Sequence, residues 1–359
     1  MNVTWILGNG FDVALGLKTK YRTFVDKVYL NPDRKDSLRD KLVKRVGDDR
    51  TLSDGSHWSD LETLLGRASS YYEGEENLFN DTFEEMQDSF IEYVHAQELR
   101  LPEDLPKEAI GEFRDSICRF FTKFAQNDRR RFPISEGIPE HIRYRFISLN
   151  YTTAFDRLLA ATKRSYSPIY ARRVGGSVFN ETVEDVLHLH GSITDGNQEA
   201  IVFGVSEASQ IACKVYADSP GFCELWVKSN KNDTIYGNDK NALLKKIVTE
   251  SNVLCIYGCS LGETDKYIWR EVGQKLLSDR QTFLVLFVHR MPDRLSGKSS
   301  TYQHKRDEAL ARFAQAAGID EDDFENVQKR IVLLPSEKLF RFDKKLCDGA
   351  SSIGRISTS

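Results

Sequence analysis

The chain has 359 residues, of which 40% are hydrophobic and 29% charged, and its net charge is −4. That length is sufficient for two domains or for one large domain with a sizeable core. The acidic balance excludes the overall basic surface of most nucleic-acid binders, and only the arginine triplet at residues 129–131 is left as a local candidate for such a contact.

Cysteine spacing and hydropathy exclude two further classes of protein. The six cysteines are scattered without paired spacing, so we expect neither a disulfide framework nor a metal site, and we interpret Cys255 and Cys259 as small buried hydrophobic residues. No apolar run is long enough to span a bilayer, and the N-terminal apolar stretch is interrupted by Asn9 and Asp12, unlike a signal peptide. We therefore expect a cytoplasmic protein without membrane contact.

Short apolar runs that end at glycine or at a polar residue predict the strands of a sheet. They cover residues 3–8, 145–150, 185–191, 199–204, 252–258, 282–288 and 330–335. Amphipathic segments between them predict helices at residues 153–163, 241–250, 264–277 and 305–318. Because strands alternate with helices and several strands are continuously apolar, we predict an α/β fold with a mostly parallel, Rossmann-like sheet.

The stretch from residue 34 to residue 138 interrupts this alternation. It contains no convincing strand, whereas aromatic and aliphatic residues recur in it at helical spacing. We therefore predict an all-helical insertion at residues 34–138, within a nucleotide-binding domain formed by residues 1–33 and 139–345. A hairpin is expected to turn at Gly175 and Gly176, and residues 346–359 are expected to form a flexible tail.

A Gly-Asn-Gly turn, Gly8 to Gly10, lies where the first strand ends and a helix begins. Glycines there allow a tight turn and a close approach of a ligand to the main chain, which is typical of nucleotide-binding βα turns. The dinucleotide fingerprint is incomplete, because Val13 occupies the position of its third glycine. Asp12 would repel a phosphate unless it caps the helix or holds a ribose hydroxyl. A turn without any ligand is the alternative interpretation.

Polar residues also follow three other predicted strands, and ligands of open α/β sheets bind beyond the carboxyl ends of strands. Asn150 ends one strand, where its carboxamide can donate and accept hydrogen bonds or merely shape the turn. His188 and His190 are two residues apart, so on a strand both imidazoles would point to one face. Such a pair suits catalysis, while a metal site is the lesser reading because no matching ligand cluster accompanies it.

The last of these strand ends is the Gly258–Ser260 loop before a helix that starts near Asp265. Ser260 and the backbone amides of this loop could meet a ribose or a phosphate. Simple helix capping by Thr264 or Asp265 would need no ligand and is the alternative interpretation.

Taken together in this order, the stretches "ILGNGFDVALGLKTKYRTF", "HWSDLE", "FISLNYTTAFDRLL", "HLHGSI" and "IYGCSLGETDKYIW" resemble the blocks of the AbiH family of bacterial abortive-infection proteins. That family in turn looks sirtuin-like. The Gly8–Gly10 turn, Asn150, His190 and the Gly258–Leu261 loop match the glycine-rich turn, asparagine, catalytic histidine and Gly-x-Ser-Leu loop of sirtuins. Thr152 replaces the usual sirtuin aspartate and the zinc-binding cysteines are absent, which argues against protein deacylation and leaves NAD cleavage open.

This resemblance implies an anti-phage effector that hydrolyses NAD⁺, its substrate, to release nicotinamide. Asn150 would orient the ribose or the attacking water, and His190 would act as the base. The diphosphate would lie on the Gly8–Gly10 turn. The remaining nucleotide contacts would come from Asp12, His188, Gly258, Ser260 and Asp265.

Two other functions are compatible with the sequence. The pocket could bind a nucleotide without turnover, as a sensor that passes its state to a partner. A nuclease or RNA-directed toxin would use residues 129–131 and the two histidines, although the acidic charge makes nucleic acid an unexpected partner. A phage or host protein as trigger and assembly into a homo-oligomer are further expectations, and the helical insertion would cover the pocket or sense infection.

Overall fold

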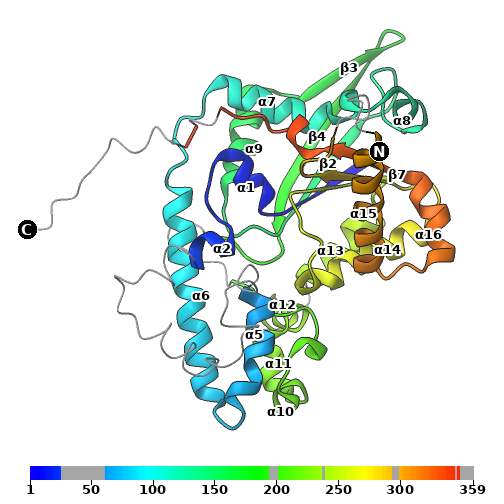
Figure 1. The fold of residues 1–359 in the computed structure, drawn as a ribbon. Helices are drawn as coiled ribbons and strands as arrows, with labels where there is room; N and C mark the ends of the chain where they lie inside the picture. Colours follow the sequence, from blue (N-terminus) through cyan, green and yellow to red (C-terminus); the bar gives the residue numbers. More distant parts are fainter. Residues whose placement is uncertain (26–60, 194–200, 237–238, 293–298, 344–345, 348–359) are drawn as a thin grey trace, which may run out of the picture.

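The computed structural model describes residues 1–25, 61–193, 201–236, 239–292, 299–343 and 346–347. Seven strands form one sheet in the order β3-β4-β2-β1-β5-β6-β7, and every neighbouring pair except β3–β4 is parallel (Figure 1). The strands are β1 Asn2–Leu7, β2 Ile142–Ser148, β3 Tyr170–Val174, β4 Ser177–His188, β5 Val253–Tyr257, β6 Phe283–Val288 and β7 Ile331–Pro335. This arrangement confirms the predicted α/β fold with a mostly parallel sheet.

The chain order of the parallel strands determines where a ligand would bind. From one edge to the other the parallel strands run β4, β2, β1, β5, β6, β7, which is the order 3-2-1-4-5-6 of doubly wound dinucleotide-binding sheets. The order reverses at β1, which pairs with β2 on one side and with β5 on the other. Ligands of such sheets bind beyond the carboxyl ends of the strands at this reversal.

Helices cover both faces of the sheet. The side chains of β1 alternate between the two faces and so belong to two separate hydrophobic clusters. Trp5 and Leu7 pack on one face with Phe113 of α7 and Phe155 of α9, while Ile6 packs on the other face in the cluster that α13, α14 and α15 complete. These helices are α7 Lys107–Cys118, α9 Ala154–Ser165, α13 Asp239–Thr249, α14 Lys266–Ser278 and α15 Ser299–Ala317.

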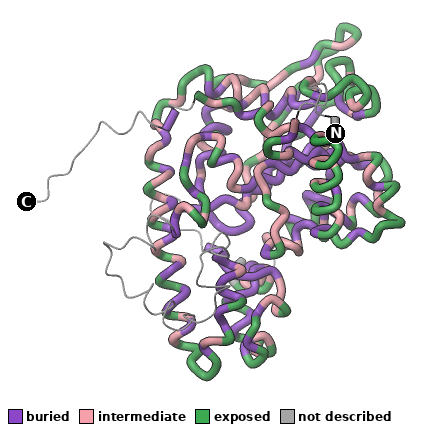
Figure 2. The backbone as a smooth tube through the Cα atoms, viewed as in Figure 1, coloured by how far each residue is buried: buried purple, intermediate pink, exposed green. Residues whose placement is uncertain are grey.

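A second hydrophobic core lies outside the sheet. It is built by α5, α6, α11 and the segment from residue 201 to residue 205, and it has fully buried aromatic residues such as Tyr72, Phe79 and Trp226. Figure 2 shows this buried zone between the helices at the bottom of the view, apart from the buried strands of the sheet. The helices around it are α5 Leu61–Ala68, α6 Glu76–Glu98, α10 Lys214–Ala217, α11 Pro220–Trp226 and α12 Lys228–Tyr236.

The remaining elements connect these layers. They are α1 Gly10–Leu15, α2 Tyr21–Phe24, α8 Gln126–Arg131 and α16 Glu321–Val327, with short 3₁₀ turns η2 Ser69–Tyr72, η3 Phe120–Lys123, η4 Ala208–Gln210, η5 Glu263–Asp265, η6 Gln328–Arg330 and η7 Ser336–Lys338. In the described residues none of these helices, nor any of the larger ones, has the length and apolar character needed to cross a bilayer.

The predicted helical insertion is divided between the two cores. Residues 61–138 form helices and turns without a strand, as expected. However, α5 and α6 belong to the second core, whereas Phe113 and Ile117 of α7 pack on the sheet. The boundary expected at residues 33–34 lies outside the described residues, so the extent of an inserted domain stays a prediction.

Two local predictions need correction. Residues 201–204 form no strand, because Ile201 and Phe203 of this apolar segment are buried in the second core instead. The Val202 amide donates to the His190 carbonyl at 2.9 Å, and the next residue, Val205, forms an isolated bridge with Val227. The tail expected from residue 346 begins too early, because Leu346 and Cys347 are buried in the core of the sheet. The hairpin at Gly175 and Gly176 is confirmed, since β3 and β4 pair antiparallel around it.

Candidate functional site

The glycines of the first βα turn are explained by a contact between two loops. The Gly10 amide donates to the Gly258 carbonyl at 2.9 Å, and a Cβ at Gly10 would lie only 2.4 Å from the Gly258 Cα. Gly8 is equally constrained, because its Cβ would lie 2.7 Å from the Gly258 oxygen. Gly258 itself has φ +71°, a conformation that glycine adopts without strain. The loops after β1 and β5 therefore meet at the strand reversal as predicted, with a packing requirement that needs no ligand.

The Asn9 side chain hydrogen-bonds Thr19, a residue that follows α1. Its amide donates to the Thr19 carbonyl at 3.0 Å, and its side-chain oxygen accepts from the Thr19 hydroxyl. The phosphate contact expected at Gly8–Gly10 stays a prediction, and the Gly10 amide and the Asn9 side chain would have to exchange these partners to make it.

A buried carboxyl lies between the ends of β1 and β2. Both oxygens of Asp12 accept from the Thr152 hydroxyl, at 2.9 and 3.0 Å. Asn150 donates through its side-chain amide to Asp12 Oδ1 and to the Gly8 carbonyl, each at 3.2 Å. Asp12 therefore does not cap α1; it ties the glycine turn to the loop after β2.

The environment of Asp12 favours its protonated form. Burial raises the pKa of Asp12 to about 7, against hydrogen bonds from Thr152, Thr19 and Asn150 that favour the carboxylate. The charge of Glu98 at the end of α6 acts in the same direction as burial. Glu98 in turn accepts from the Thr153 backbone amide at 3.0 Å and from the Thr153 hydroxyl.

The two histidines do not form the expected pair on one strand face. The strand β4 ends at His188, and residues 189–190 form a turn, so the alternation assumed for both imidazoles is wrong. The two rings contact different elements. The His188 Nε2 lies 2.9 Å from Asp156 of α9, whereas the His190 Nε2 lies 3.3 Å from Asp265.

His190 and Asn150 nevertheless end neighbouring strands at equivalent positions. Ser148 of β2 pairs with His188 of β4, and each of the two residues lies two positions beyond that pair. The His190 ring also hydrogen-bonds the backbone of Leu149, directly before Asn150. Both side chains are buried, with 3% of His190 and 7% of Asn150 exposed.

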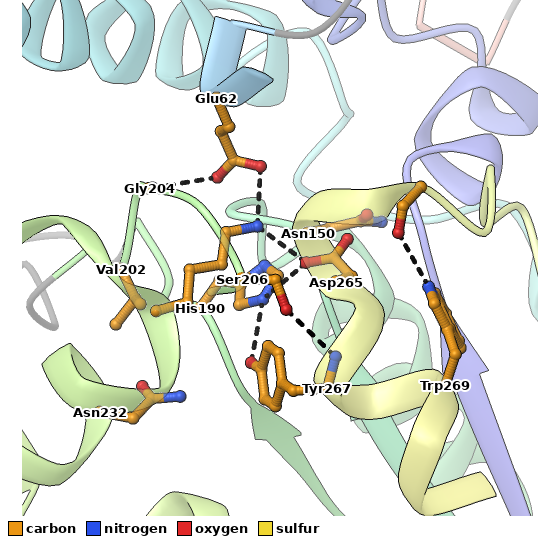
Figure 3. A network of polar contacts seen from close by, with 12 residues as sticks. Glu62, Asn150, His190, Val202, Gly204, Ser206, Asn232, Asp265, Tyr267 and Trp269 are labelled. Carbon is orange, nitrogen blue, oxygen red and sulfur yellow. Dashed lines mark hydrogen bonds and ion pairs between the residues drawn. The ribbon is translucent and has the colours of Figure 1, made fainter. Parts of the chain in front are cut away.

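A buried ionic network surrounds His190 (Figure 3). The Lys228 Nζ lies 2.7 Å from Asp265 Oδ1 and 2.7 Å from Glu62 Oε2, and the Lys228 side chain is 1% exposed. The Tyr267 hydroxyl lies 3.5 Å from the His190 Nε2. Glu62 is brought by α5, so the second hydrophobic core contributes a charge to this network.

The network sets the charge of each member. Burial and the Lys228 cation lower the pKa of His190 to about 3, so the imidazole is neutral at pH 7 and the short distance to Asp265 becomes an ion pair only on protonation. Burial lowers the pKa of Lys228, but the charges of Asp265 and Glu62 outweigh it and hold the pKa above its usual value. Burial likewise raises the pKa of Asp265, and Lys228 outweighs it to hold the pKa below its usual value.

A cavity of about 260 Å³ opens beside the loop after β5. Cys259, Ser260 and Leu261 line it together with His289, which follows β6, and Lys305 and Arg312 of α15. Cys259 also lies against Gly8, because a Cβ there would be 2.8 Å from its sulfur. The cavity is therefore adjacent to the glycine turn, although neither Asn150 nor His190 lines it.

Several members of the site were not singled out from the sequence. Glu62 ends the "HWSDLE" stretch that carries part of the family resemblance, so that block was its signal. Tyr151 follows Asn150 directly, and its hydroxyl lies 3.5 Å from Glu62 Oε1. No feature of the sequence singles out Lys228, because a lone lysine at the start of a polar helix is usually solvated.

Two of the three arginines at residues 129–131 contact other parts of the protein. Arg131 pairs with Asp128 at 2.8 Å and donates to the carbonyls of Lys329 and Ile331, and Arg129 donates to the Thr122 carbonyl. Within the described ranges, no group of three or more His, Cys, Asp or Glu side chains is placed to hold a metal ion.

Comparison with known proteins agrees with this reading of fold and motifs. The model of the family described as bacteriophage abortive infection AbiH matches residues 4–287, which is more than half of the chain and includes the ends of β1, β2, β4 and β5. No curated protein matches the chain. The chain therefore belongs to the AbiH family of bacteriophage abortive-infection proteins, and this membership supports an anti-phage role.

Proposed function

We propose that the protein acts in abortive infection as an NAD⁺ glycohydrolase, which releases nicotinamide and ADP-ribose. The observation that carries this proposal is the position of Asn150 and His190. They follow neighbouring parallel strands at equivalent positions, beside the glycine turn where the strand order reverses. Nucleotides bind at that place in sheets of this order.

The cavity beside Ser260 offers a seat for the nucleotide. Ile256, Leu286 and Val288 give it an apolar lining, which suits a flat base. Lys305 and Arg312 also line it and pair with Glu308 at 3.0 and 3.4 Å, so a phosphate there would have to exchange with this carboxylate. The Gly8–Gly10 turn is one side chain away, so a dinucleotide in this cavity would extend across the turn toward Asn150.

Asn150 is suited to orient the ribose or the attacking water. Its two amide protons are directed to Gly8 and Asp12, which fixes the plane of the carboxamide. Its Oδ1 atom is then the group that accepts a hydrogen bond from a ribose hydroxyl or from water. Such prior orientation lowers the entropic part of the barrier.

His190 is suited to accept a proton late in the reaction. The bond between the ribose C1′ and the nicotinamide nitrogen breaks, nicotinamide leaves as a neutral molecule, and water adds to the cationic C1′. That water becomes strongly acidic as its C–O bond forms, so even a base with a low pKa takes its proton. The carboxylate of Asp265, 3.3 Å from the ring, then stabilises the imidazolium.

The test is nicotinamide release by the purified protein and NAD⁺ content in infected cells. We expect release by the wild type and a loss of at least about 100-fold in His190→Gln and Asn150→Ala, the usual scale for a general base. His141→Gln is the matched control, because this exposed histidine precedes β2 at the opposite edge of the sheet. Infected cells that are protected by the protein without losing NAD⁺ would refute the proposal.

A nucleotide-binding sensor without turnover is the second candidate. The burial of His190 and Asn150 favours it, because a substrate must displace protein groups to reach them. Calorimetry with NAD⁺ and ADP-ribose separates the two. Tight binding that survives His190→Gln, together with no nicotinamide release, would favour the sensor.

A further inference from the structure

Lys228 is a buried cation that contacts two carboxylates, the buried Glu62 and the partly buried Asp265, whose side chain is 19% exposed. It is the first residue of α12, and its Nζ contacts Glu62 and Asp265 at 2.7 Å each. Removing an ammonium group from water is costly, and well-packed apolar residues often replace buried ion pairs without loss of stability. A buried charge next to a candidate catalytic group is therefore better explained by function than by stability.

The groups that face His190 come from four elements and one loop, and Figure 3 shows Asp265 and Tyr267 beside the ring. Asp265 ends η5, Tyr267 lies in the first turn of α14, Lys228 begins α12, Lys240 lies on α13, and Tyr151 lies in the loop after β2, with 6.4 Å between the ring centroids. Of these, Asp265 favours the imidazolium, whereas Lys228 and Lys240 oppose it. Lys240 donates to the His188 carbonyl at 2.7 Å, so its charge is held at the backbone two residues before His190.

We propose that Lys228 is a positioning residue, which holds Asp265 beside His190 and keeps the imidazole neutral until the reaction supplies a proton. Its catalytic meaning rests on the proposed function, but its effect on His190 does not. Lys228 binds Asp265 Oδ1, the same oxygen that lies nearest the His190 Nε2. The ammonium and the imidazole therefore compete for one carboxylate oxygen. While Lys228 occupies it, the resting site contains a neutral base.

This competition can be separated from the total charge of the cluster. In the wild type, Glu62, Lys228 and Asp265 sum to one negative charge with His190 neutral. The double variant E62Q/K228M leaves Asp265 alone, which is again one negative charge. Any change in the titration midpoint of His190 then reports the loss of the contact between Lys228 and Asp265, not a change in net charge.

The experiment is an NMR titration of the histidine-labelled full-length protein from pH 4 to pH 8. The resonance of His190, one of seven histidines, is assigned with His190→Asn. We expect the wild-type ring to stay neutral throughout and the double variant to bind a proton with a midpoint about 1–3 pH units higher, the usual effect of an opposite charge at this distance. Lys228→Arg should behave as the wild type. E62Q/K228Q makes the same charge change with polar side chains and replaces the double variant should methionine prevent folding.

The control is Lys231→Met, one turn further along α12, where the lysine lies over the Trp226 ring at 5.7 Å and does not touch the network. It should leave the His190 titration unchanged. Equal His190 midpoints in the wild type and in the folded double variants would overturn the proposal.

Nicotinamide release distinguishes this outcome from a failure of the proposed function. If the protein is an NAD⁺ glycohydrolase, the acid limb of its pH profile should move upward with the His190 midpoint in the double variant. A shifted titration with no release by the wild type would retain the role of Lys228 and reject the hydrolase. Release with an unshifted titration would do the reverse.

Discussion

Asp12 and Asp265 are two aspartates at the same edge of one sheet, and their surroundings shift their pKa values in opposite directions. Asp12 has only neutral donors, Thr152 and Asn150, and burial raises its pKa to about 7. Asp265 has Lys228 at 2.7 Å, and its pKa falls below the usual value despite burial. Hydrogen bonds alone therefore do not offset desolvation here, whereas one cation does.

The largest effect on stability should come from removing the Lys228 cation, which separates Asp265 from Asp12 in this comparison. Lys228→Met leaves the buried Glu62 and the partly buried Asp265 without their counter-charge, so we expect the free energy of unfolding at pH 7 to fall by about 3–5 kcal/mol. Denaturant unfolding measures it. Lys231→Met is the matched control and should cost about 1 kcal/mol or less, the scale of a cation–π contact. A loss in Lys228→Met as small as that of the control would show that the network is not strongly desolvated.

The second prediction concerns the pH dependence that Asp12 adds to stability. Its folded-state pKa of about 7 lies above the 3.8 of an aspartate in an unfolded chain, so the folded state holds the proton more tightly than the unfolded chain does. This contribution to stability is complete below pH 4 and is lost as the pH rises to about 7.

Asp12→Asn should remove that dependence. Relative to the wild type, the variant should gain about 2–4 kcal/mol between pH 5 and pH 8, because the amide has no proton to lose. Unfolding free energies at the two pH values measure the change. A constant difference between the two proteins across this range would mean that Asp12 is already ionised at pH 5.

The third prediction tests the loops that bring the two aspartates to one edge. Gly10→Ala places a Cβ 2.4 Å from the Gly258 Cα, a backbone atom that cannot rotate away. We expect a loss of about 1–3 kcal/mol, as for other overpacked sites. Gly137→Ala is the control, since no atom lies within 4 Å of its added Cβ, and it should change stability by about 0.5 kcal/mol at most.

The sequence predicted β1, β2, β5, β6 and β7 because each contains a short apolar run, but the same signal failed at residues 201–204. That segment is apolar because it lies in the second hydrophobic core, and periodicity does not distinguish a buried connection from a buried strand. The helices of residues 61–138 were predicted by their spacing, whereas their division between two cores depends on tertiary packing.

The candidate site shows the same limit. The glycine turn, Asn150 and the loop after β5 were found because they end strands, which is a property of local sequence. Lys228 was not found, because its two partners lie 166 and 37 residues away in the chain. The different directions of His188 and His190 depend on where β4 ends, and a pattern of two residues does not contain that information.

The smallest effect should come from the charge nearest to Asp12. Glu98 raises the pKa of Asp12 through space, while its own carboxylate accepts from the Thr153 amide at 3.0 Å, a bond that a glutamine oxygen can keep. Glu98→Gln should therefore lower the midpoint of the Asp12-dependent stability change by less than about 1 pH unit, since burial and the hydrogen bonds from Thr152 and Thr19 affect the pKa of Asp12 more than Glu98 does. Unfolding curves from pH 5 to pH 8 measure that midpoint, with Asp12→Asn as the background in which the Glu98 effect should vanish. A shift of equal size in that background would assign the effect to Glu98 itself and would leave burial as the sole cause of the raised pKa of Asp12.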